Sequence, residues 1–176
     1  MILLSDLTTG DKIQIIAQFV TLTAALIGAI IAARTSLKVL SIQRDDIKRN
    51  FCLELKKQLD LPEMFACRYE AWRKLDEGKF DSITTVHDLL HSTDYDNKVS
   101  IVLHFFESLE YYCERNMVDT ELAYKLFGRV YKMWYDRLIK KLTLDEKSQS
   151  YTNWFNNLTS LGKRFEEISA QQQGSR

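Results

Sequence analysis

The longest uninterrupted apolar run of the chain lies close to its N-terminus, from Ile13 to Ala33. Its 21 positions hold no charged residue, and its polar side chains are Gln14, Gln18, Thr21 and Thr23. As a helix the run would measure about 31 Å, which matches the hydrocarbon thickness of a bilayer. A cleaved signal peptide is the competing interpretation. The run is too long for the apolar core of such a peptide, and acidic residues precede it instead of a basic cluster. The pattern therefore predicts a transmembrane helix over residues 13–33.

The pattern after the span predicts one long helix that continues to residue 60. No proline interrupts this stretch, and it keeps an apolar side made by Leu40, Ile47, Phe51, Leu55 and Leu59. Pro62 favours the start of a second helix, because proline suits the first helical position, and Gly78 favours its end.

Four further helices are predicted from apolar periodicity and capping residues. We expect a short helix near Thr85–His91, a central helix over Asn97–Arg115, one capped by Asp119 and a last one capped by Asp145. The fold class is thus all-α. Its parts are a short extracytoplasmic N-terminus (1–12), the span (13–33), the long-helix extension (34–60), a helical domain (61–170) and a frayed tail (171–176).

Flanking charge sets the predicted orientation. Asp6, Asp11 and Lys12 precede the span, whereas a basic series that begins with Arg34, Lys38 and Arg44 follows it. Basic flanks stay in the cytoplasm, so we expect the N-terminus outside and the helical domain inside a bacterial inner membrane. The formal net charge is 0, which gives no reason to expect non-specific nucleic-acid binding. Three cysteines without a CxxC pair fit a reducing compartment.

Polar and small residues follow one side of the predicted span. They recur at steps of four and three and are Gln14, Gln18, Thr21, Ala25, Gly28 and Ala32. Such a stripe is suited to contact with another helix or with water, and a lone span must find that helix in another subunit. Two interpretations stay open: close packing of spans in a dimer or ring, or a ring whose lumen the stripe lines. Both predict a homo-oligomer in the lipid bilayer.

Candidate chemistry is sparse. The chain lacks the phosphate-binding, nucleophile-elbow and zinc-protease motifs. His87 and His91 are four residues apart, but no third ligand is set by spacing, so we predict neither a metal nor a cofactor. His104 lies in an apolar helix and is expected to be a hydrogen-bonded core histidine. Lys125, Arg129 and Lys132 form a basic stripe, which is either a solvated face or a candidate contact for RNA or a partner.

Several segments carry a resemblance to a known family. They are Phe105–Tyr111, Val118–Ala123, Leu126–Gly128 and Trp134–Tyr135. In these residues and in its organisation the chain resembles a widespread prokaryotic family with one N-terminal span and a helical cytoplasmic domain. It is also similar to a specialised branch, the small membrane accessory proteins of type VI-B CRISPR loci, which assist an RNA-guided, RNA-cleaving effector.

The resemblance implies anti-phage defence that acts through damage to the inner membrane. The branch is associated both with pore formation and with a HEPN-like ribonuclease assignment. A HEPN signature needs an Arg four to six residues before a His, and here only Lys98 precedes His104 suitably. Lysine lacks the planar fork of arginine, so we expect no enzyme and favour a membrane pore. The alternatives are a membrane-tethered RNA-binding or RNA-cleaving domain and a dimeric structural adaptor.

Overall fold

The computed structural model describes the backbone of residues 9–174 and the side chains of residues 25–174. Helices make up 83% of the structure and no strand is found in it, which confirms the all-α prediction. The elements along the described chain are α1 (Thr9–Leu59), α2 (Pro62–Asp76), α3 (Val86–His91), α4 (Asn97–Glu114), α5 (Thr120–Arg137), the 3₁₀ turns η2 (Ile139–Lys141) and η3 (Glu146–Tyr151), and α6 (Thr152–Gly174).

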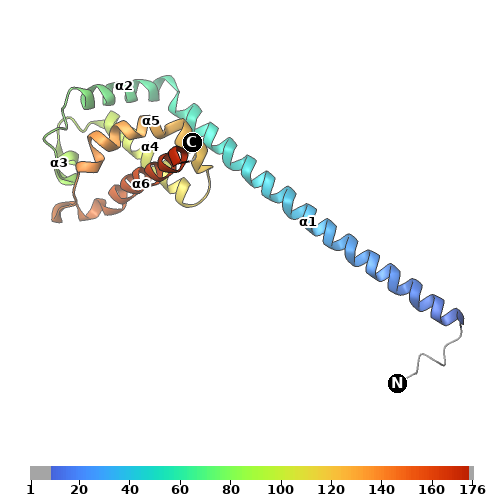
Figure 1. Cartoon of the computed structure of the whole chain (residues 1–176). Coiled ribbons are helices and arrows are strands. Elements are labelled where there is room, and N and C mark those ends of the chain that lie inside the picture. The colour runs from blue at the N-terminus through green and yellow to red at the C-terminus, as the bar shows by residue number, and fades with distance from the viewer. Residues whose placement is uncertain (1–8, 175–176) are drawn as a thin grey trace. The chain divides into compact units, whose positions relative to one another are not determined.

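Helix α1 runs without a break from Thr9 to Leu59 (Figure 1), which confirms that the predicted apolar run continues into a long helix. No proline occurs before Pro62, so nothing in the backbone chemistry interrupts it. The chain divides into two compact units, one up to Asp45 and one from Asp46 onward. The second unit contains the C-terminal end of α1 and all the other helices.

The boundaries of α2 follow the sequence signals closely. Leu61 occupies the N-cap and Pro62 the first helical position. The Arg68 guanidinium donates a hydrogen bond of 3.0 Å to the carbonyl of Leu59, so it satisfies a group that the end of α1 leaves free. At the other end, Gly78 adopts a φ of 72°, a left-handed conformation that favours glycine.

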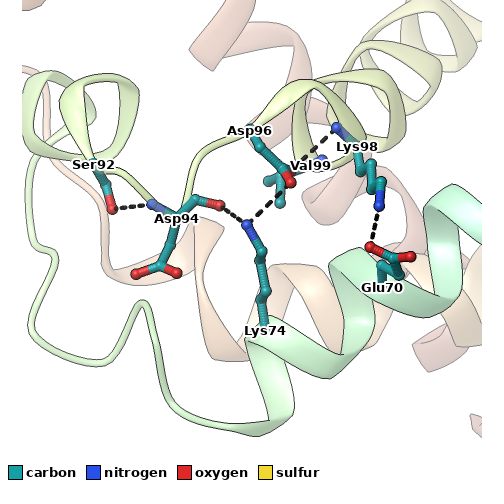
Figure 2. A network of polar contacts seen from close by, with 7 residues as sticks. All are labelled: Glu70, Lys74, Ser92, Asp94, Asp96, Lys98 and Val99. Atoms are coloured by element: carbon teal, nitrogen blue, oxygen red, sulfur yellow. Dashed lines mark hydrogen bonds and ion pairs between the residues drawn. The ribbon is translucent and has the colours of Figure 1, made fainter.

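A polar network fixes α2 against the start of α4 (Figure 2). The ammonium of Lys74 on α2 lies 3.1 Å from a carboxylate oxygen of Asp96 and donates to the carbonyl of Asp94 at 2.9 Å. The other oxygen of Asp96 accepts the backbone N–H groups of Lys98 and Val99, each at 3.1 Å, and so caps α4. One turn before Lys74, Glu70 pairs with the Lys98 ammonium.

The two predicted aspartate caps have different outcomes. Asp119 caps α5 as expected, because its carboxylate accepts the N–H of Leu122 at 3.0 Å. Asp145 does not cap the last helix: η3 intervenes, and α6 begins only at Thr152. The Asp145 carboxylate instead accepts the hydroxyl of Ser148. At its other end α6 includes residues 171–174, which we had expected to be frayed.

The core of the second unit is centred on α4, which packs against both α2 and α6. Its buried residues share a dense set of aromatic contacts, notably Phe106 against Tyr131 at 4.9 Å between ring centroids. Tyr131 also donates its buried hydroxyl to the carbonyl of Leu158, so α5 is tied to α6. Burial raises the pKa of Tyr131, which keeps this hydroxyl a donor.

A buried carboxylate joins α4 to α6. The side chain of Glu110 is 4% exposed and receives two hydrogen bonds from Arg164, from Nε at 3.0 Å and from Nη2 at 2.8 Å. This two-point contact raises the pKa of Arg164 and compensates the charge that burial would otherwise penalise.

We predict that Arg164→Met destabilises the domain by about 3 kcal/mol, because it leaves the Glu110 carboxylate buried without its partner. Denaturant titration of the full chain in mild detergent measures the change. The matched control is Lys140→Met, which breaks the exposed pair with Glu166 and should cost less than about 1 kcal/mol. Equal losses in the two variants would contradict a structural role for the buried pair.

The three cysteines differ in accessibility. Cys52 and Cys113 are buried, whereas Cys67 is half-buried on α2. Burial, aided by the nearby charge of Glu110, raises the pKa of the Cys113 thiol to about 12. A thiol reacts as its thiolate, so Cys113 is protected by both burial and protonation.

Alkylation of the native protein with a maleimide at neutral pH should therefore modify Cys67 alone. Unfolding in denaturant should expose all three thiols, which mass spectrometry would count. Rapid native labelling of Cys113 would contradict the packing of α4 described above.

Candidate functional site

The described part of the predicted span is exposed within the chain. From Ala25 onward, α1 contains a stretch with a mean hydropathy of 1.6, none of which is buried, so the helix is long and apolar enough to cross a membrane. Leu26, Ile27, Ile30 and Ile31 are 48–63% exposed. No part of the described chain covers these side chains, which form an exposed apolar surface.

The small residues of the predicted stripe are also open. Ala25, Gly28 and Ala32 are exposed, and a Cβ added at Gly28 would meet nothing within 4 Å. Thr35 needs no outside partner, because its hydroxyl donates to the carbonyl of Ile31 at 2.9 Å. The side chains of Gln14, Gln18 and Thr21 lie outside the described residues. For Ala25, Gly28 and Ala32, pore lining and helix packing therefore both stay open.

The basic residues after the span fall into two groups, one without ion-pair partners in the described chain and one that contacts the helical domain. Arg34, Lys38 and Arg44 are exposed, and their side chains have no ion-pair partner among the described residues. The next two cations anchor α1 on the domain: Lys48 donates to the Asn116 side chain at 2.6 Å, and Arg49 lies 3.4 Å from the carboxylate of Asp119. Arg34, Lys38 and Arg44 therefore make no ion pair in the part of the chain that the structure describes.

The basic stripe Lys125, Arg129 and Lys132 lies exposed along a groove of about 480 Å³ between α5 and α6. Lys132 pairs with Asp136 at 2.9 Å, whereas Lys125 and Arg129 have no ion-pair partner in the described part of the chain. Tyr135 forms part of the floor, and a Cβ at Gly162 would come within 2.1 Å of its ring, so only glycine admits this packing. The stripe is solvated, and contact with RNA or a partner stays a prediction.

A second groove, of about 440 Å³, lies between α2 and α5 and was not foreseen from the sequence. We call it the aromatic groove; the large exposed side chains that line it are Phe65, Tyr69, Trp72 and Met133. The first two are 56% and 57% exposed. Arg129 stands at its edge and also lines the first groove. A signal was present in the sequence, since Leu61, Phe65, Tyr69 and Trp72 are spaced by four, four and three residues.

The prediction for His104 was wrong. Its side chain is 58% exposed and hydrogen-bonds to the Glu107 carboxylate at 2.8 Å, so it is no core residue. The apolar neighbours Leu103 and Phe106 turn inward on either side of it. Lys98, the cation that most nearly meets the HEPN spacing, pairs instead with Glu70 on α2. His104 contacts Glu107 within α4, so the two side chains have different ion-pair partners.

The two histidines of α3 lie side by side, and among the described residues no third metal-ligating side chain joins them. The rings of His87 and His91 are 4.1 Å apart, and Nδ1 of His91 contacts the carbonyl of His87 at 2.9 Å. In the described residues no group of three or more His, Cys, Asp or Glu side chains could hold a metal ion.

A scan against the models of known protein families gives no match to this chain, and no curated protein or solved structure matches it either.

We predict that the purified full chain does not cleave unstructured RNA, because the cation before His104 is a lysine engaged by Glu70. Incubation with a labelled single-stranded RNA tests this. Lys98→Ala and His104→Ala serve as matched variants, and both alter exposed side chains. Cleavage by the wild type that either variant abolishes would establish the ribonuclease alternative.

Proposed function

We propose that this chain is a single-span inner-membrane protein that assembles into a homo-oligomeric ring and permeabilises the membrane during anti-phage defence. Its N-terminus faces outward and its helical domain faces the cytoplasm. It acts beside an RNA-guided, RNA-cleaving CRISPR effector and enhances that defence by depolarising the membrane.

One observation carries the membrane assignment: α1 presents an apolar surface that nothing in the described chain covers. Water is a poor solvent for such a surface, whereas hydrocarbon is a good one. The unpaired Arg34, Lys38 and Arg44 follow directly and support insertion with this end inside.

The small-residue stripe supports assembly of the spans. Lipid tails drive no association by themselves, so close packing of small residues is the usual means by which spans meet. A helix with side chains is about 10 Å wide, and a ring of four or five fills its own centre; an aqueous lumen therefore needs roughly six or more. Ala25, Gly28 and Ala32 leave space at the inner half of such a lumen. A dry apolar constriction resists ions until it is wetted, which offers a gate.

The defence role rests on the resemblance in residues 105–135 and on the organisation of the chain. The pore is preferred to the RNA-cleaving alternative because Lys98 pairs with Glu70 on α2, whereas His104 contacts Glu107 on its own helix. A dimeric adaptor would have the same span and the same packing of small residues as the pore. The two differ in the number of subunits and in whether the assembly conducts ions.

We predict that Ala25→Leu or Gly28→Leu abolishes depolarisation during phage challenge, because either change fills or dries the lumen. Gly28→Leu has room within its own chain, so misfolding is no simple explanation for its effect. A voltage-sensitive dye in infected cells measures the response. Leu26→Val and Ile30→Val, on the opposite side of the helix, are the controls and should respond as the wild type does. Equal depolarisation by all four variants, at matched expression, would leave the stripe as packing only.

A further inference from the structure

The aromatic groove exposes four large side chains that lie next to one another. With about 200 Å² for a large side chain, its four exposed residues leave roughly 400 Å² of apolar area open. A patch of this size is comparable to the largest apolar patch on a typical soluble domain, which is often functional. The groove is also pre-formed, because the Lys74–Asp96 and Glu70–Lys98 contacts hold α2 in place beside α4.

The edge of the aromatic groove is cationic. Arg129 has no ion-pair partner in the described residues, and Arg68 lies on the opposite wall, where its own contacts are with Phe65, Leu59 and Asp60. An occupant that suits both the walls and the edge is therefore an apolar helix face with a carboxylate in its middle.

Helix α1 carries such a face after the predicted span. The apolar side chains of this face are exposed by 47%, 52% and 44% and belong to Val39, Ile42 and Leu53. Asp46 lies on the same side of α1, between Ile42 and Leu53. This free face is distinct from the one that α1 packs on its own domain: Leu55, nine residues after Asp46, is half a turn away and buried. Asp46 is exposed and has no ion-pair partner, since Arg49, one turn on, contacts Asp119.

We infer that the aromatic groove of one subunit receives the free α1 face of a second copy of this chain, with Asp46 of one copy against Arg129 of the other. This inference rests on the proposed homo-oligomer and names its cytoplasmic interface. The two surfaces differ, so the contact is head-to-tail, and a head-to-tail contact generates a ring when its rotation closes.

The area of this contact is sufficient for a specific interface. The two surfaces together offer about 600 Å² of apolar area, and an interface that is a little over half apolar would then bury about 1,000 Å² in total, near the lower limit for specific contacts. The unpaired Asp46 and Arg129 supply register, because a like charge at either position is strongly disfavoured.

Charge reversal tests the inference in the full chain. Asp46→Arg and Arg129→Asp should each weaken subunit association by about tenfold or more, and the double variant should restore it. Mass measurement in mild detergent over a dilution series gives the oligomer distribution. Lys147→Asp is the matched control: it makes the same change in charge at an exposed position of η3, outside the aromatic groove, and should leave the distribution as in the wild type.

Each remaining outcome overturns the inference. An oligomeric wild type with unchanged single variants leaves the aromatic groove to another occupant while the proposed function stands. The inference also fails if the double variant associates no better than the single variants, or if Lys147→Asp weakens association equally. A wild type that is monomeric at every concentration overturns both this interface and the proposed ring.

Discussion

The exposed apolar stretch of α1 that begins at Ala25 imposes the constraint on which the rest of the molecule depends, because its side chains have no cover in the described chain. Leu26, Ile27, Ile30 and Ile31, each about half exposed, represent about 4 kcal/mol of unfavourable hydration. That is a sizeable fraction of the 5–15 kcal/mol that stabilises an ordinary domain. Whatever covers α1 therefore contributes to stability on the scale of folding itself.

The charges of the helical domain fall into two groups with different functions. Glu110–Arg164 and Lys74–Asp96 are satisfied within the chain, and they fix α6 and α2 against α4. Arg129 and Asp46 are exposed and lack ion-pair partners among the described residues. The satisfied pairs hold the helices in a single arrangement, and this arrangement gives the unpaired charges defined positions. Pre-organisation of this kind lowers the ordering cost that any later association must overcome.

The sequence was sufficient for features that depend on local chemistry. Pro62, Gly78 and Asp119 mark helix ends correctly, because capping and backbone preferences act within a few residues. The sequence was insufficient for features that depend on tertiary packing. Asp145 looks like a cap, yet its carboxylate bonds to Ser148 and a 3₁₀ turn forms. His104 is flanked by core residues, yet its own direction on α4 is outward. The aromatic groove combines two helices distant in sequence, so periodicity shows only the α2 half of it.

A small cytoplasmic contact and a small-residue span are weak alone and effective together. Lipid drives no span association, and an interface near 1,000 Å² binds only modestly in free solution. In the assembly that we propose, spans that meet in a membrane would hold the aromatic groove and the free α1 face at a high effective concentration, so each contact would strengthen the other. A head-to-tail contact adds one further interface when the ring closes, so the closed ring is favoured over open chains. The proposed contact between spans and the proposed contact between the aromatic groove and the free α1 face would thus together specify an assembly that neither contact would form alone.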